Sequence, residues 1–307
     1  MINILVTGGA GFIASHVVDR FVGAGHRVVV VDNLSTGRKE NLNPRAKFYK
    51  ADIRGKEIRR IIRDHKIQVI SHHAAQIDLR YSVASPVCDA EINILGSINL
   101  CEAAVGTGVR TIIFSSTGGA IYGEIAGRMA DESHPLNPLS PYGIAKLSVE
   151  KYLYFYKHVY GIDHVILRYA NVYGPRQNSR GEAGVVAIFT GAMLGGRSPV
   201  INGTGRQTRD YCYVGDIADA NLLALRCKGS DIFNVGTGIE TDVNAVWRHL
   251  KRLTGYRGKT VRGPAKEGEQ MRSVLNCAKL RKTAGWKPKT DLESGLAQTV
   301  EWFRASV

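Results

Sequence analysis

A tyrosine and a lysine four residues apart are the side chains best suited to acid–base chemistry in this sequence. Tyr142 and Lys146 occur in SPYGIAKLSVEKYLYFY. If this segment is a helix, both side chains emerge on one face, one turn apart. A lysine ammonium near a phenol favours the phenolate and lowers the tyrosine pKa from about 10. We therefore predict Tyr142 as a general base and Lys146 as its activator, on a helix capped by Ser140 with Pro141 at its first position.

A run of hydroxyl side chains precedes this pair, in FSSTGGAIYGE at 114–124. The run follows an apolar, strand-like segment, with Ser115 predicted as the last strand residue. Strand alternation would then turn Ser116 to the opposite face. The residues leave open which of three hydroxyls, including Thr117, takes part in chemistry. The two glycines that follow let the backbone come close to a ligand and offer it N–H donors.

The chain opens with the pattern of a dinucleotide-binding turn. Gly8, Gly11 and Ala14 in TGGAGFIASH form a GxxGxxA motif between a strand-like run and a helical pattern. Such glycines allow a tight turn and let N–H groups approach a pyrophosphate at the helix N-terminus. Asp32 follows at the end of VVVVD, where a carboxylate binds an adenosine ribose diol and opposes a 2′-phosphate. The sequence therefore predicts NAD as the cofactor.

Strand-like and helical segments alternate through the first half of the chain, which is typical of a parallel sheet covered on both faces. The strand-like runs lie at 47–52, 68–75, 110–116 and 164–174. The helical patterns lie near 56–64, 89–105 and 142–160. Asp52, at the end of one predicted strand, either contacts the adenine or caps the helix that follows.

We expect an α/β fold: a Rossmann-type doubly wound parallel sheet in an NAD-binding domain over 1–172, and a smaller α+β substrate lobe over 173–307. Some later segments would return to the sheet. Beyond about Gly174 the sequence is rich in glycine and charge, as in GGRSPVINGTGRQTRDY. Loops of this length are typical of binding elements.

Composition restricts the location and the partners. The 41 basic and 27 acidic residues give a net charge of +14, but the charges are scattered, so we predict no nucleic-acid partner. The five cysteines lie far apart without histidines at ligand spacing, which predicts reduced thiols and no metal site. No apolar run approaches the roughly 20 residues that span a bilayer. We therefore expect a cytoplasmic protein that does not enter membranes.

Together these motifs resemble the extended short-chain dehydrogenase/reductase superfamily, and within it the UDP-galactose (UDP-glucose) 4-epimerases. The resemblance covers nearly the whole chain. It rests on TGGAGFIASH, VVDNLSTG, HHAAQ, SSTGGAIYGE, SPYGIAK, LRYANVYGPRQ, GRQTRDYCYVGDIADA, FNVGTG and GWKP.

The resemblance implies reversible C4 inversion of UDP-glucose and UDP-galactose through a transient 4-keto sugar, with tightly bound NAD and Tyr142 as base. Lys146 would also hold the nicotinamide ribose. A hydroxyl would bridge the sugar 4-oxygen and the tyrosine. Counting from the strand end assigns this role to Thr117, with Ser116 in reserve. Because the loop is one residue longer than in relatives, counting back from Tyr122 gives Gly118 instead.

The resemblance also implies two sets of binding residues. The cofactor contacts are Gly8, Gly11, Phe12, Ile13, Asp32, Asn33, Asp52, Ile53, Ala74, Ala75, Gln76, Asn93, Tyr142, Lys146 and Tyr169. The substrate contacts are Thr117, Gly118, Tyr142, Asn171, Gln207, Arg209, Lys266, Glu269 and Ser273.

Several of the substrate contacts have specific implied roles. Asn171 and Arg209 would bind the diphosphate, as bidentate arginine chemistry favours. Lys266 replaces a phosphate-binding arginine, and Glu269 lies near the nucleoside ribose. The small Ser273 leaves room for an N-acetyl group, so UDP-N-acetylhexosamines are predicted to be tolerated.

Other readings stay open at this point. Related dehydratases place an Asp-Glu pair in the hydroxyl loop, and decarboxylating relatives place a Glu there. The Thr-Gly-Gly of this chain lacks such an acid and favours epimerisation. Another nucleotide-sugar epimerase or dehydratase is the alternative enzyme, and a non-catalytic NAD- or RNA-binding module is the alternative from a different class.

Helices near 89–105 and 142–160 pair across a two-fold axis in relatives, so we expect a homodimer. The stripe of Tyr152, Tyr156 and Tyr160 fits such a seam, or packing within one chain.

Overall fold

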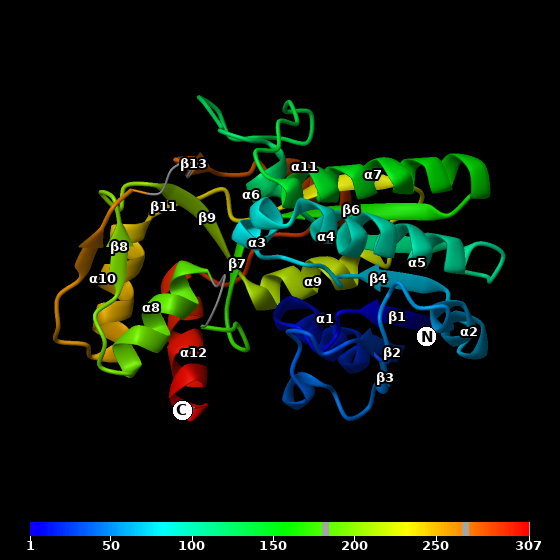
Figure 1. Ribbon diagram of the computed structural model, residues 1–307, viewed down its shortest axis with the longest axis horizontal. Coiled ribbons are helices and arrows are strands. Elements are labelled where there is room, and N and C mark those ends of the chain that lie inside the picture. Colours follow the sequence, from blue (N-terminus) through cyan, green and yellow to red (C-terminus); the bar gives the residue numbers. More distant parts are fainter. Residues whose placement is uncertain (180–183, 266–269, 307) are drawn as a thin grey trace.

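A seven-stranded parallel sheet forms the larger part of the protein (Figure 1). The computed structural model describes residues 1–179, 184–265 and 270–306. The strands follow the order β10-β6-β5-β4-β1-β2-β3, and every neighbouring pair is parallel. Their bounds are β1 Asn3–Thr7, β2 Arg27–Asp32, β3 Lys47–Lys50, β4 Val69–His72, β5 Thr111–Thr117, β6 Asp163–Tyr169 and β10 Asp231–Val235.

Helices cover both faces of this sheet. Successive strand residues point to opposite faces, and apolar residues occur on both. Ile4 and Val6 pack in a core with α1 and α9, whereas Leu5 packs in a second core with α2, α5 and α7. Helices α5 and α7 therefore cover one face of the sheet, and α1 and α9 cover the other. The helices of this part are α1 Phe12–Gly23, α2 Glu57–Asp64, α3 Leu79–Ala84, α4 Pro86–Ala90, α5 Gly96–Ala104, α6 Gly118–Ile121, α7 Pro141–Tyr160, α9 Val214–Ala224 and α11 Ala278–Ala284, with a 3-10 turn η1 at Lys39–Asn41.

A smaller lobe has its own sheet and its own apolar core. Strand β9 lies at the centre of a four-stranded sheet, paired with β7, β11 and β13. Its core includes Phe189, Met193, Leu250 and Leu296. The lobe contains β7 Asn171–Tyr173, α8 Val185–Leu194, β8 Val200–Asn202, β9 Thr208–Tyr213, β11 Glu240–Asp242, α10 Val243–Thr254, β12 Val261–Gly263, β13 Arg272–Ser273 and α12 Leu292–Ala305.

The predicted fold class is confirmed. The chain crosses between the two parts more than once, because β10 and α9 belong to the large sheet although they follow β7 and β9 in sequence. The division into 1–172 and 173–307 stays a prediction.

Three predicted elements have different limits. The strand expected at 164–174 is two strands, because Ala170 donates its N–H to the Val235 carbonyl and the chain then joins the lobe sheet as β7. The helix expected near 89–105 contains a wider π-helical turn, η2 Glu91–Leu95. Ser115 is not the last strand residue, because β5 pairs with β6 through Thr117.

In the described ranges, no helix is long and apolar enough to cross a bilayer. All five cysteines are free; two are buried and three are half-buried.

Candidate active site

The predicted site residues gather at the carboxyl edge of the large sheet. Asp32, Thr117 and Tyr169 are the last residues of β2, β5 and β6. Thr117 and Tyr169 lie directly opposite each other on neighbouring strands. In doubly wound folds, ligands bind outside this edge.

The glycine turn after β1 has the geometry of a pyrophosphate site. Gly8 has φ +70°, and a Cβ on it would lie 2.8 Å from the backbone N of Ala74, so only glycine fits. Gly11 is the N-cap of α1 and supplies no side-chain cap. The first N–H groups of this twelve-residue helix, those of Phe12 and Ile13, are therefore available to an anion.

Asp32 is buried and oriented by two backbone amides. One carboxylate oxygen accepts the Ala10 N–H at 3.0 Å and the other accepts the Leu34 N–H at 2.7 Å. The carboxylate is thereby fixed beside the glycine turn, as recognition of an adenosine ribose requires.

Asp52 is bound by neighbouring side chains. Arg54 donates two side-chain N–H groups to its carboxylate, each at 2.9 Å, and Asn33 donates one at 3.0 Å. The Arg54 hydrogen bond is the largest cause holding the pKa of Asp52 well below its usual value. The predicted helix cap is wrong, because the N-cap of α2 is Lys56. The adenine contact of Asp52 and Ile53 stays a prediction.

Two hydrogen bonds join Asn93 to the backbone of Gln76, which lies in the segment after β4. The Asn93 amide accepts the Gln76 N–H at 2.8 Å and donates to the Gln76 carbonyl at 2.9 Å. Both side chains also donate to Asp89, which is buried. Asp89 was not among the predicted site residues, although it precedes Asn93 by one helical turn. The π-helical turn that contains Asn93 is a feature common at functional sites.

The helix that carries Tyr142 and Lys146 has the predicted start. Ser140 is the N-cap and its hydroxyl accepts the Gly143 N–H, with Pro141 at the first turn. Lys146 is 4% exposed and donates to the Ser115 carbonyl at 2.8 Å. Its ammonium lies 5.8 Å from the centre of the Tyr142 ring. Burial lowers the pKa of Lys146 to about 8, against the opposing effect of two carboxylates, Asp89 and Glu150.

The predicted lowering of the Tyr142 pKa is wrong for the protein by itself. Burial raises this pKa above its usual value, and the negative charge of Asp89 adds to the effect. The ring is half-buried, and the loss of water around it is the larger of the two causes.

The hydroxyl loop distinguishes the three candidate residues. A Cβ on Gly119 would lie 3.7 Å from Thr117 Oγ1 and 3.6 Å from Asn171 Oδ1, so these two predicted substrate contacts converge. Ser116 lies on the opposite face of β5, where its hydroxyl donates to Glu150 at 2.6 Å. This geometry does not support the reserve assignment to Ser116.

Gly118 has a different reason to be glycine from the one we expected. A Cβ on it would lie 2.5 Å from Leu275 Cδ1, so the Leu275 side chain already fills the space that a larger residue would need. Close packing of the apolar Leu275 accounts for Gly118, and only Gly119 faces the polar groups of the site.

Two histidines of the HHAAQ motif lie at the same edge and were not assigned from the sequence. His72 lies between the hydroxyls of Thr7 and Ser97, at 2.8 and 2.9 Å. His73 stacks on Tyr169 with the ring centres 6.4 Å apart. Burial, followed by the charge of Lys146, lowers the pKa of His73 to about 3, so its ring is neutral.

The lobe sheet brings three predicted substrate residues together. Asn171 lies on β7, Arg209 on β9 and Ser273 on β13, and Ser273 pairs directly with Arg209. Gln207 is buried and donates to the Asn202 carbonyl at 3.5 Å. Two predicted contacts, Lys266 and Glu269, lie outside the described residues.

The hydroxyl loop is attached to the strand that carries Ser273. The Glu124 carboxylate accepts the N–H groups of Met271 and Arg272 at 2.9 and 3.0 Å. Arg272 in turn donates to the carbonyls of Ile125 and Gly127. These contacts fix β13 over the loop that presents Thr117.

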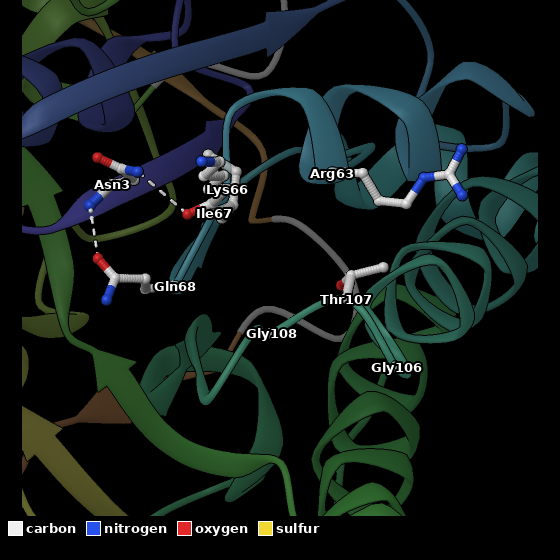
Figure 2. A pocket seen from close by; sticks show the side chains of 8 residues that line it. All are labelled: Asn3, Arg63, Lys66, Ile67, Gln68, Gly106, Thr107 and Gly108. Carbon is white, nitrogen blue, oxygen red and sulfur yellow. Dashed lines mark hydrogen bonds between the residues drawn. The ribbon is translucent and has the colours of Figure 1, made fainter.

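A surface hollow of about 510 Å³ lies at the opposite, amino edge of the large sheet (Figure 2). It is open, and none of the predicted site residues lines it. Its lining residues are Asn3, Arg63, Lys66, Ile67, Gln68, Gly106, Thr107 and Gly108. Among the described residues, no group of three His, Cys, Asp or Glu side chains is arranged to hold a metal ion.

Known proteins share this architecture over the full chain. The NAD dependent epimerase/dehydratase family matches residues 4–236. The chain is similar to a UDP-glucose 4-epimerase from Thermotoga maritima, solved with UDP-glucose: 50% identity, 99% of each chain covered and a TM-score of 0.97. It is also similar to a Thermus thermophilus UDP-glucose 4-epimerase in complex with NAD, with 43% identity, 100% of each chain covered and a TM-score of 0.95.

A third solved structure is a UDP-N-acetylglucosamine 4-epimerase from Methanobrevibacter ruminantium, in complex with UDP-N-acetylmuramic acid. It is 34% identical, with a TM-score of 0.94 and coverage of 100% of this chain and 99% of that one.

The two loop glycines give a matched pair of stability predictions. Gly118→Ala forces a Cβ against the fully buried Leu275 and should lower the free energy of unfolding by about 1–3 kcal/mol. Gly119→Ala meets only ordinary contacts and should change it by less than about 0.5 kcal/mol. Urea unfolding of both variants measures the difference, and equal losses would contradict this description of the loop.

Proposed function

Because the chain belongs to the NAD dependent epimerase/dehydratase family, we propose that it is an NAD-dependent UDP-sugar 4-epimerase that interconverts UDP-glucose and UDP-galactose. One observation carries the proposal: Lys146 and the Tyr142 ring meet at the carboxyl edge that also holds the glycine turn and Asp32. The likeness to UDP-glucose 4-epimerases over the whole chain supports the same function.

The residues present fit NAD. The close approach of Gly8 to Ala74 leaves room for backbone only, and the uncapped N-terminus of α1 offers N–H donors to a pyrophosphate. Asp32 would bind the adenosine ribose, and Lys146 the nicotinamide ribose. When bound there, NAD would supply reversible hydride transfer at the sugar C4.

The side chains of this protein handle the proton of the same step. Tyr142 accepts the proton of the sugar 4-hydroxyl as the 4-keto sugar forms, and donates it back after the sugar turns. Lys146 stabilises the phenolate, and Thr117 holds the 4-oxygen by a hydrogen bond. Proton and hydride both return, so the sugar undergoes no net oxidation.

The lobe residues select the nucleotide sugar. Asn171 and Arg209 bind the diphosphate, with Gln207, Lys266 and Glu269 as further contacts. Ser273 leaves space beside the sugar, and the likeness to a UDP-N-acetylglucosamine 4-epimerase supports UDP-N-acetylhexosamines as additional substrates. The loop at 117–121 contains no acid for elimination, which disfavours a dehydratase.

Two properties of the whole molecule belong to the proposal. We place the protein in the cytoplasm, a reducing compartment that suits its five free cysteines. We also propose a homodimer. Exposed apolar side chains follow one stripe along α7, where Ile144, Tyr152, Phe155 and Val159 are each more than two fifths exposed. Tyr156, in contrast, packs within the chain.

The proposed dimer should be disrupted by a charge placed in the exposed apolar stripe of α7. Phe155→Glu places a carboxylate in the apolar seam and should convert the protein from dimer to monomer in sedimentation velocity. Ile239→Glu changes an apolar residue outside α7 that is even more exposed than Phe155, and should leave the dimer intact. A wild-type monomer would contradict the assignment of this surface.

The function predicts a specific assay. Wild-type protein should convert UDP-galactose to UDP-glucose without added NAD, and retention of NAD without turnover would favour a binding module. Tyr142→Phe removes the base and should lower kcat about 10²- to 10⁴-fold. Thr117→Val removes one hydrogen bond and should lower kcat about 10- to 100-fold. Near-normal turnover by Thr117→Val would mean that the loop acts through its backbone.

The small side chain of Ser273, which is 2% exposed, predicts substrate selectivity. Ser273→Tyr should lower the ratio of UDP-N-acetylglucosamine to UDP-galactose turnover by at least about tenfold, because the ring occupies the N-acetyl space. Ser273→Ala keeps the space and should leave the ratio unchanged. An unchanged ratio in Ser273→Tyr would exclude Ser273 as the gate.

A further inference from the structure

A buried ion pair lies one helical turn beyond Lys146 on α7. Glu150 on α7 accepts two hydrogen bonds from Arg168 on β6, Nε to Oε1 at 3.0 Å and Nη2 to Oε2 at 2.6 Å. The two side chains are 3% and 2% exposed. Neither residue was identified from the sequence, and the proton and hydride steps described above use neither.

The pair is the centre of a larger hydrogen-bonded group. Ser116 donates to Glu150 Oε1 at 2.6 Å, and Arg168 Nη1 donates to the Tyr122 hydroxyl at 2.9 Å. Tyr122 then donates to Asn234 on β10 at 2.7 Å. One carboxylate therefore joins helix α7 to strands β5 and β6, and through Tyr122 to β10.

Three members of this group are close neighbours of residues proposed for the reaction. Glu150 follows Lys146 by one helical turn. Ser116 precedes Thr117 on β5, and Arg168 precedes the nicotinamide-side Tyr169 on β6. Ser116 and Arg168 lie opposite each other, and so do Thr117 and Tyr169. Because strand side chains alternate, one pair faces α7 and the next pair faces away from it.

We propose that Glu150 is a positioning residue: its buried pair with Arg168, together with the Ser116 hydrogen bond, sets the position of Tyr142 and Lys146 relative to Thr117. This rests on the proposed function. Apolar replacement of a buried ion pair is often neutral or stabilising, so overall stability is a weak reason for it to be here. The pair fixes the orientation of Glu150 relative to Arg168 as well as their separation, since the planar guanidinium and carboxylate meet through two hydrogen bonds.

The double variant Glu150→Leu/Arg168→Met separates positioning from stability. It removes both charges together and refills their volume, so the protein should fold with a Tm near that of the wild type. Misplacement of the reacting groups should lower kcat for UDP-galactose about 10- to 100-fold, with KM within about twofold. The substrate diphosphate contacts lie on the lobe sheet and are unchanged.

Two single variants complete the test. Ser116→Ala removes one hydroxyl, leaves the ion pair in place and should lower kcat by about tenfold or less, again without a change in KM. Tyr156→Phe is the matched control: it removes a buried hydroxyl of the same helix that donates to Glu102, far along α7 from Tyr142. Its kcat should equal that of the wild type.

A second readout does not depend on sugar turnover. Spectrophotometric titration of the NAD-bound protein, with Tyr142→Phe as reference, reports the ionisation of Tyr142. The charges around this phenol are Lys146 on α7 and Asp89 on α4. The double variant should ionise at higher pH than the wild type, because Lys146 is less well placed.

The outcomes are distinct. Wild-type kcat and wild-type Tyr142 ionisation in a folded double variant would overturn the proposal for Glu150. A fall in kcat that only follows the folded fraction, measured by circular dichroism, would also overturn it. An inactive wild type would contradict the proposed function and leave the titration to decide the role of Glu150.

Discussion

The buried ammonium of Lys146 joins the catalytic helix to the sheet through one hydrogen bond, to the Ser115 carbonyl at 2.8 Å. Five side chains of the site lie around this charge. The tyrosine ring lies beside it, the rings of His72 and His73 are kept neutral near it, and two carboxylates, Asp89 and Glu150, favour its protonated form. A buried cation without such neighbours would lose its proton, and with it any influence on the phenol.

Sequence reasoning succeeded where local structure depends on residue spacing. The glycine turn, Asp32 at the end of β2 and the tyrosine–lysine pair each lie within one βα unit or one helix, and their elements are confirmed. The pairing of Glu150 with Arg168 and of Ser116 with Glu150 depends on strand register and helix rotation. Neither quantity can be obtained from residue spacing. For the same reason the sequence did not predict the contact between Gly118 and Leu275, which comes from a segment more than 150 residues away.

The electrostatics of Tyr142 show a second limit of pattern-based reasoning. A lysine one turn away predicts an acidic phenol, and the spacing was correct. Burial is the larger contribution in the protein by itself, and it depends on all the elements that surround the ring. The position of a charge is often visible in a sequence, whereas the amount of water around it is not.

The return of the chain to the large sheet has a consequence for biosynthesis. Strand β10 completes the sheet edge beside β6, and α9 covers the face that α1 leaves open, yet both follow the first strands of the lobe. A nascent chain that ends at residue 172 would expose the edge of β6 and much of one apolar core. The nucleotide-binding half therefore cannot finish folding before residue 235 leaves the ribosome, although its fingerprint glycines are among the first residues made.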